Sequence, residues 1–176
     1  MLPSGFQTAR LNLRPIAPDD RDPIFDGYAQ DAEVTRYLIW RPHRSREETA
    51  AYIAVCAETP PTIARTYMLT GRDGGIVRGG FDLRQPAPHR LEFGYVLARP
   101  FWGQGLMTEA LTEVADWALR QDHVFRISAV CDIENIGSAR VMEKAGLIRE
   151  GMPRRLMIHP NVSDEPRDCF SYARVR

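Results

Sequence analysis

The sequence has almost no lysine, no excess charge and no long apolar run. Lys144 is the single lysine among 23 basic residues, which 23 acidic residues balance to a formal net charge of zero. This balance removes the long-range attraction used by nucleic-acid and anionic-membrane binders, so we expect neither partner. No stretch approaches the ~18 apolar residues of a transmembrane helix, and residues 1–6 lack the features of a signal peptide. We therefore expect a cytoplasmic protein.

Cysteine and histidine are also too sparse to suggest a covalent framework or a metal site. Cys56, Cys131 and Cys169 are odd in number and widely spaced. Without C-x-x-C spacing, they predict neither a disulfide framework nor a cysteine-based redox site. The four histidines are scattered and lack the spacing of metal ligands. We expect reduced thiols and no bound metal.

What the sequence does contain is the patterning of a mixed α/β fold. Its 176 residues fit a single domain over the whole chain, 1–176. Alternating apolar and polar positions predict strands near 8–15, 65–70, 76–83, 91–98, 124–130, 147–157 and 168–175. Periodicity and capping residues predict helices near 19–28, 31–38, 45–58, 103–119 and 135–145. Short links between the second, third and fourth strands predict an antiparallel meander, and 158–167 is expected to be a polar, mobile loop.

A glycine loop opens the most periodic helix. The segment Arg99–Glu109 follows a strand and carries Gly103 and Gly105. Glycine lets the backbone approach a ligand, and the unpaired N–H groups of a first helical turn attract phosphate. The alternative is an ordinary helix start that contains glycine.

Two known phosphate loops fit this segment poorly. It lacks the lysine of a P-loop. It matches only two of the three glycines of a dinucleotide-binding fingerprint, and it follows an antiparallel meander. A dinucleotide-dependent oxidoreductase is therefore our third hypothesis.

A second block runs from Asn135 to Gly146, where Asn135 follows a strand and Ser138 lies in the first helical turn. Alone, Asn135 is a helix cap. Together, the two blocks resemble the GNAT acetyltransferase superfamily, in particular the branch of ribosomal-protein N-terminal (alanine) acetyltransferases. The segments that carry the resemblance span almost the whole chain: Thr8–Arg14, Asp31–Leu38 with Trp40, Glu92–Tyr95, Trp102–Ala110, Asn135–Gly146 and Asp168–Ala173.

The resemblance implies a GNAT-like fold, with one largely antiparallel sheet of six to seven strands, flanking helices and splayed central strands. It also implies acetyl-CoA as the acetyl donor and coenzyme A as a product. The pantetheine arm is expected between the splayed strands, and the pyrophosphate on the glycine loop. The implied cofactor-binding residues are Val96, Leu97, Trp102, Gly103, Gln104, Gly105, Leu106, Met107, Thr108, Asn135, Ser138 and Lys144. For Lys144, a solvated helix face is the alternative.

The resemblance further implies direct attack of an acceptor amine on the thioester, with a backbone N–H near Val96 stabilising the oxyanion. Many family members place a tyrosine on the helix that follows Asn135 as proton donor. Met142 stands there in this chain and cannot donate, so Ser138 is our candidate acid. Glu92, on the strand beside the cofactor slot, is our candidate base. The alternatives are that Ser138 only binds cofactor and that Glu92 is an ion-paired strand residue.

Tyr37 and Trp40 fall where the family's second helix borders the acceptor site, so the resemblance implies that they bind substrate. Core packing is the alternative. The resemblance implies an acceptor that is a primary amine, with a protein N-terminus and small amines both open. A homodimer is compatible with the superfamily. A non-catalytic acyl-CoA-binding regulator or sensor is our second hypothesis, favoured by the missing helix tyrosine.

Overall fold

The computed structural model describes all 176 residues and contains one sheet with the strand order β1-β2-β3-β4-β5-β6-β8-β7. The strands are β1 Phe6–Gln7, β2 Leu11–Pro15, β3 Ala64–Gly71, β4 Gly74–Ala87, β5 Arg90–Leu97, β6 Arg126–Asp132, β7 Ile148–Gly151 and β8 Cys169–Val175. Every neighbouring pair is antiparallel except β5 and β6. The predicted mixed, largely antiparallel fold is confirmed. The sheet has one strand more than the seven predicted. This is β1, whose two residues are too few to produce an alternating pattern.

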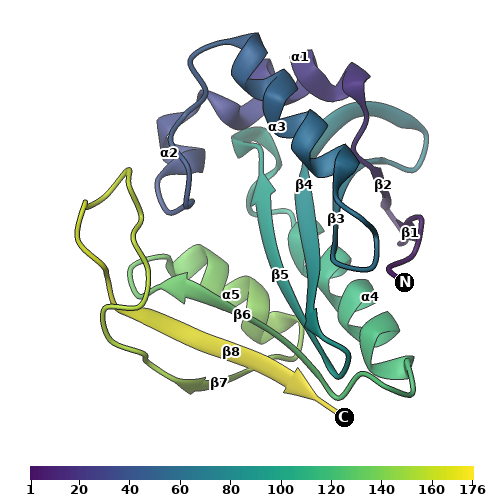
Figure 1. The fold of residues 1–176 in the computed structure, drawn as a ribbon, viewed down its shortest axis with the longest axis vertical. Coiled ribbons are helices and arrows are strands. Elements are labelled where there is room, and N and C mark those ends of the chain that lie inside the picture. Colours follow the sequence, from purple (N-terminus) through teal and green to yellow (C-terminus); the bar gives the residue numbers. More distant parts are fainter.

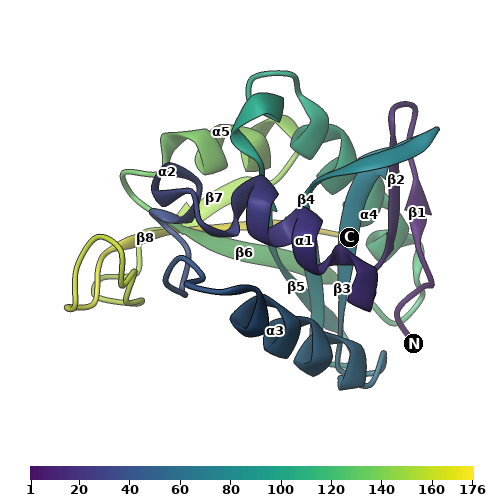
Figure 2. The ribbon, with the colours of Figure 1, turned by 90° about the horizontal axis from the view of Figure 1, so that it is seen from above.

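The helices lie on both faces of this sheet (Figure 2), with α1–α3 on one face and α4 and α5 on the other. They are α1 Arg21–Ile24, α2 Ala32–Thr35, α3 Arg46–Glu58, α4 Leu106–Arg120 and α5 Ile136–Lys144. A 3₁₀ turn (Pro18–Asp20) precedes α1 and a π-helical turn (Phe25–Ala29) follows it. None of the helices combines the length and apolar character needed to cross a bilayer.

Local sequence explains where the helices begin and end. The Ser45 hydroxyl accepts the N–H of Glu48 at 3.4 Å, so α3 starts at the predicted cap. Gly146 has a φ of 82°, the left-handed conformation that favours glycine just after a helix, here α5.

Two apolar cores hold the layers together. The larger one packs α4 and α5 against the sheet through residues such as Phe81, Leu83 and Phe93. The smaller one packs α1–α3 against the opposite face and includes Tyr28 and Met68. Side chains that alternate along β4 and β5 therefore point to different layers.

The sheet opens at its centre. Strands β5 and β6 pair only through Arg90, Leu91 and Glu92 with the segment 126–128. Beyond these residues the two strands diverge, and the two halves of the sheet fan apart (Figure 1). The predicted splay is confirmed.

The C-terminal region differs from the expectation. The strand predicted over 147–157 is only β7, Ile148–Gly151, because the chain then leaves the sheet. Met157 returns to pair with Arg167 in an isolated bridge. The segment 158–167 is fastened rather than free: the Asn161 side chain donates to the carbonyls of Thr35 (2.7 Å) and Trp40 (2.8 Å). Its polar residues bind neighbouring loops, which a hydropathy pattern does not reveal.

Candidate functional site

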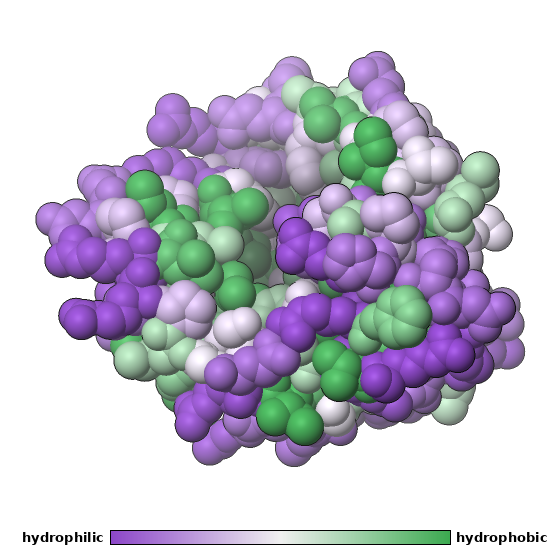
Figure 3. Space-filling model, turned by 60° about the horizontal axis from the view of Figure 1, so that its bottom comes forward, coloured by the Kyte–Doolittle hydropathy of each residue, from purple (hydrophilic) through white to green (hydrophobic).

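A cleft of about 630 Å³ lies where β5 and β6 diverge. Residues of β4–β6, the start of α5, the helices of the N-terminal third and the loop after β7 line it. The face drawn in Figure 3 is hollowed near its centre, and hydrophobic side chains border the hollow. The cleft reaches both Ser138 and Trp40, so one continuous space joins the two expected binding regions.

The glycine loop is shaped to present backbone N–H groups. Gly103 and Gly105 both have φ of 73°, and a Cβ on Gly103 would meet no atom within 4 Å. Gly105 is the residue before α4, and the first intrahelical N–H bond of that turn comes from Glu109. The N–H groups of Leu106, Met107 and Thr108 therefore lack intrahelical partners. These residues fit a pyrophosphate, which needs an open approach and unpaired donors.

The side chains of the glycine loop pack or bond within the protein. Leu106 and Met107 are buried in the larger core, so only their backbone is available to a ligand. Gln104 donates to the carbonyl of Pro100 at 2.9 Å. Arg10 donates to the carbonyl of Gln104 at 3.0 Å and pairs with Glu109 at 2.6 Å. Arg10, the residue before β2, therefore holds the glycine loop in position through these contacts.

The edge of β5 is the second part of the cofactor region. The N–H of Ala98 donates to the carbonyl of Arg78 at 2.8 Å, and the β4–β5 register is regular from 79↔97 to 84↔92. Antiparallel residues alternate between bonded and unbonded pairs, so Val96 points its N–H toward β4 and Leu97 points its N–H toward the gap. The carbonyl of Leu97 accepts the indole N–H of Trp102 at 2.6 Å.

Asn135 and Ser138 meet this edge from the other side of the gap. The Oδ1 atom of Asn135 accepts the N–H of Ser138 at 3.1 Å, so Asn135 caps α5, and both residues line the cleft. Lys144 lies at the far end of α5, exposed and away from the cleft-lining residues.

Comparisons with known proteins agree with this geometry. A family model described as an acetyltransferase (GNAT) domain matches residues 10–148. The N-acetyltransferase YnaD of Bacillus subtilis (strain 168) is 36% identical over 147 residues, which cover 82% of each chain.

Solved structures share the fold. The microcin C7 self-immunity acetyltransferase MccE, solved with acetyl-CoA and AMP, has a TM-score of 0.87 at 18% identity, covering 99% of this chain and 97% of that one. The acetyltransferase that modifies the N-terminal serine of ribosomal protein L7/L12 in Salmonella typhimurium has a TM-score of 0.82 at 20% identity, covering 96% of both.

The chain belongs to the GNAT acetyltransferase family. It is an N-acetyltransferase whose acetyl donor is acetyl-CoA. The resemblance predicted from the sequence is confirmed, and nothing in the comparisons supports the non-catalytic alternative.

A tyrosine that sequence reasoning did not assign to the site contacts Ser138, the residue predicted to be the proton donor. The Tyr95 hydroxyl lies 2.9 Å from Ser138 Oγ and donates to the Ser138 carbonyl at 3.1 Å. Burial raises the pKa of Tyr95, although its hydrogen bond with Ser138 opposes the shift. Met142 is buried in the wall at the position where the family often has tyrosine. A phenol therefore reaches this region from β5 instead of from α5.

Glu92 lies at the closed end of the gap, where β5 still pairs with Ser128 of β6. Its side chain lines the cleft, is 39% exposed and lies 3.8 Å from Arg90. The contact with Arg90 is loose, so the carboxylate keeps free oxygen lone pairs.

One side of the cleft is aromatic. Tyr37 and Trp40, expected to border the acceptor, both line the cleft, together with Tyr28, His43 and Tyr52. Burial lowers the pKa of His43, which favours its neutral form. Asp82 of β4 also lines the cleft and was missed, because one aspartate in an alternating strand gives no distinctive sequence signal.

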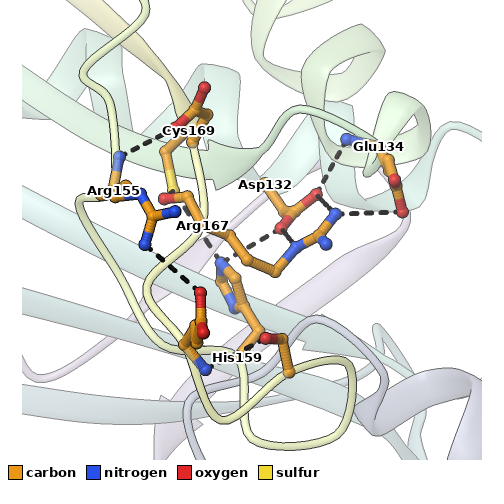
Figure 4. A network of polar contacts seen from close by, with 9 residues as sticks. Asp132, Glu134, Arg155, His159, Arg167 and Cys169 are labelled. Carbon is orange, nitrogen blue, oxygen red and sulfur yellow. Dashed lines mark hydrogen bonds and ion pairs between the residues drawn. The ribbon is translucent and has the colours of Figure 1, made fainter.

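A polar network fastens the loop after β7 to the end of β6 (Figure 4). Fully buried Asp132 accepts from Arg167 at 2.5 and 3.2 Å, and Arg167 also pairs with Glu134 at 3.1 Å. Buried His159 lies 3.8 Å from Asp132 and 3.9 Å from the sulfur of Cys169. Burial acts to raise the pKa of Asp132, but its bonds with Arg167 and the N–H of Glu134 outweigh that effect and lower it. Of the residues in this network, His159 lines the cleft.

Proposed function

We propose that this enzyme acetylates a primary amine by direct transfer within the cleft, and that a polypeptide N-terminus is the acceptor. The single observation that supports direct transfer is the continuity of the cleft from Ser138 to Trp40. A space shared by donor and acceptor needs no acylated side chain to carry the acetyl group between them.

In this proposal the acetyl donor is held by backbone groups and helix ends. The N–H groups from Gly103 to Thr108 bind its pyrophosphate, while Val96, Leu97, Asn135 and Ser138 border its pantetheine arm. Trp102 restrains the carbonyl of Leu97, and Gln104 braces the loop. Lys144 is assigned to the 3′-phosphate as a flexible, exposed cation. Bound acetyl-CoA supplies the thioester that the amine attacks.

Three groups of this chain act on the reacting atoms. Glu92 takes a proton from the acceptor's ammonium group, so that a neutral amine can attack. The N–H of Leu97, which points into the gap, stabilises negative charge on the carbonyl oxygen. The Ser138 hydroxyl, paired with Tyr95, delivers a proton to the leaving sulfur, and the proton that the attacking nitrogen loses as the amide forms restores this hydroxyl.

The acceptor assignment draws on two supports. The Salmonella neighbour modifies the N-terminal serine of a ribosomal protein. In this chain, Tyr37 and Trp40 flank a cleft large enough to admit the first residues of an extended chain. The proposal includes a cytoplasmic location, since all three cysteines are free thiols, and a homodimer, which light scattering of the purified protein tests.

Calorimetric titration with acetyl-CoA, with NADH as a control, tests the donor site. We expect saturable binding of acetyl-CoA and none of NADH. Gly105→Val is expected to weaken acetyl-CoA binding at least about tenfold, because a β-branched residue is strained at a φ of 73° and crowds the phosphate loop. The control Gly151→Ala, whose Cβ would meet nothing within 4 Å, leaves binding unchanged.

An acceptor screen with N-terminal peptides and small amines then tests the reaction. Acetylation of peptide α-amines, detected by mass spectrometry, supports the assignment. Acetylation of small amines alone contradicts the polypeptide acceptor, and NADH binding without acetyl-CoA binding contradicts the whole proposal.

A further inference from the structure

The acceptor half of the cleft is built from aromatic rings. Five of them line it: Tyr28, Tyr37, Trp40, His43 and Tyr52. Trp40 and His43 lie with ring centroids 5.0 Å apart, and His43 and Tyr52 lie 6.0 Å apart. Faces of aromatic rings attract cations and exclude water from the groups that they enclose.

A carboxylate faces this aromatic group from the sheet. Phe81 and Leu83 point into the larger core, so Asp82 between them points to the opposite face, toward α3. Its cross-strand partner on β5 is Gly94, and the guanidinium of Arg84 lies 3.7 Å from where a Cβ on Gly94 would stand. The Asp82 side chain is 35% exposed and lines the cleft.

The carboxylate of Asp82 has unused capacity. The Thr66 hydroxyl donates to it at 3.2 Å, and its only ion pair is with Arg84 Nε at 3.3 Å. That nitrogen is buried but makes no hydrogen bond, so the geometry of the pair is poor. Two carboxylate oxygens accept about four hydrogen bonds, so room remains for a further donor.

The surroundings penalise this negative charge. Burial raises the pKa of Asp82, although Arg84 and Thr66 oppose the shift. A bound cation would offset the penalty, because an opposite charge stabilises the ionised form. A carboxylate that is costly to hold and incompletely paired is suited to ligand binding.

We propose that Asp82 and the aromatic wall bind the α-amine of the acceptor as an ammonium ion, and that the N-terminal residue carrying this amine is apolar or aromatic. Asp82 is a binding residue in this account, and proton removal remains with Glu92. The inference rests on the proposed function, because it names the acceptor class for the same cleft.

A pair of ligands of equal size isolates the charge: 2-phenylethylamine, which is an ammonium ion near neutral pH, and 2-phenylethanol. Calorimetry measures their binding to the enzyme alone and again with coenzyme A present. We expect the ammonium ion to bind about 10- to 100-fold more tightly than the alcohol, as charge-assisted hydrogen bonds allow. Equal affinities, or no binding of the amine under either condition, would overturn the proposal.

Asp82→Asn keeps the shape of the side chain and removes its charge. We expect the preference for the amine to fall below about threefold while the alcohol binds as before. Removing a penalised charge also leaves the thermal midpoint equal or higher. Asp122→Asn, an exposed aspartate in the turn before β6, keeps the full preference. If Asp82→Asn still prefers 2-phenylethylamine over 2-phenylethanol as the wild type does, the proposal is wrong.

These measurements separate the two proposals because binding needs no turnover. If no amine is acetylated but ammonium binding depends on Asp82, the proposed function fails and the binding site stands. If amines are acetylated without a charge preference, the binding proposal fails alone. In turnover, Asp82→Asn is expected to raise KM for the amine, whereas Glu92→Gln lowers kcat.

Discussion

At the scale of single residues, the pairing of Ser138 with Tyr95 is the most informative contact in the cleft. The two hydroxyl oxygens lie 2.9 Å apart, and each residue comes from a different side of the gap. The pair offers a proton at the place where the family often uses a helix tyrosine, here replaced by buried Met142. We infer that the donor role has moved to this pair.

Substitution of the pair tests that role. Ser138→Ala is expected to lower kcat by roughly 10²-fold, as loss of a general acid does, with KM for acetyl-CoA changed by less than about threefold. Tyr95→Phe keeps the serine and loses only its partner, so a smaller loss of kcat is expected. Steady-state kinetics with Ser4→Ala, an exposed serine, as the control measures both. An unchanged kcat with a raised KM would show that Ser138 only binds acetyl-CoA.

Single residues were predictable where a backbone pattern marks them. The sequence predicts helix starts at Asn135 and near Gly103, and the structure has Asn135 and Gly105 as N-caps, with Gly103 in the turn before α4. Tyr95 lies in the predicted strand near 91–98, but alternation does not show that its hydroxyl crosses the gap. Asp82 was missed for the same reason: a strand aspartate gains meaning only once it is known to line the cleft.

At the scale of elements, one buried charge pair joins the loop 152–168 to the end of β6. Asp132 is fully buried, while the side chain of Arg167 is 22% exposed. Breaking such a pair leaves a charge without its partner inside the protein. The loop also carries Asn161, whose side chain donates to the carbonyl of Trp40. The Asp132–Arg167 pair therefore helps to position the aromatic wall through this loop.

Asp132→Asn is expected to lower the free energy of unfolding by about 3 kcal/mol near neutral pH, as for other broken buried pairs. Urea unfolding measures it, with Glu165→Gln in the exposed Arg155 pair as a control that changes stability by less than about 1 kcal/mol.

The same substitution has a defined pH dependence. The pKa of Asp132 is lowered in the folded protein, so its stabilisation is complete above the unfolded value of about 4. It is lost as pH falls through the lowered folded pKa. The difference between wild type and Asp132→Asn should therefore narrow below about pH 4. An equal difference at neutral and acidic pH would contradict an ionic anchor.

Most elements were predictable because their periodicity is local, including the β3–β5 meander and α3–α5. The anchored loop was not, because its structure depends on Asp132 and Arg167, which lie 35 residues apart in sequence. A polar composition is typical both of a loop that is fully solvated and of a loop that is held by specific contacts.

At the scale of the whole molecule, the two halves of the sheet create the site by separating. The β5–β6 pairing ends after Glu92 and Ser128, and the cleft begins there. In the proposed reaction, the glycine loop and the start of α5 hold the donor. The aromatic wall around the acceptor comes from the turn after α1 (Tyr28), the segment between α2 and α3 (Tyr37, Trp40 and His43) and α3 (Tyr52). In the proposed reaction, donor and acceptor therefore meet in one space, and the acetyl group passes directly between them.

Initial-rate kinetics give the most direct test of this transfer. Rates of coenzyme A release are measured against acetyl-CoA at several fixed concentrations of an accepted amine, and intact mass spectrometry follows the enzyme with acetyl-CoA alone. The account predicts double-reciprocal lines that intersect and a protein whose mass is unchanged. Parallel lines, together with an acetylated protein that passes its acetyl group to the amine, would contradict direct transfer.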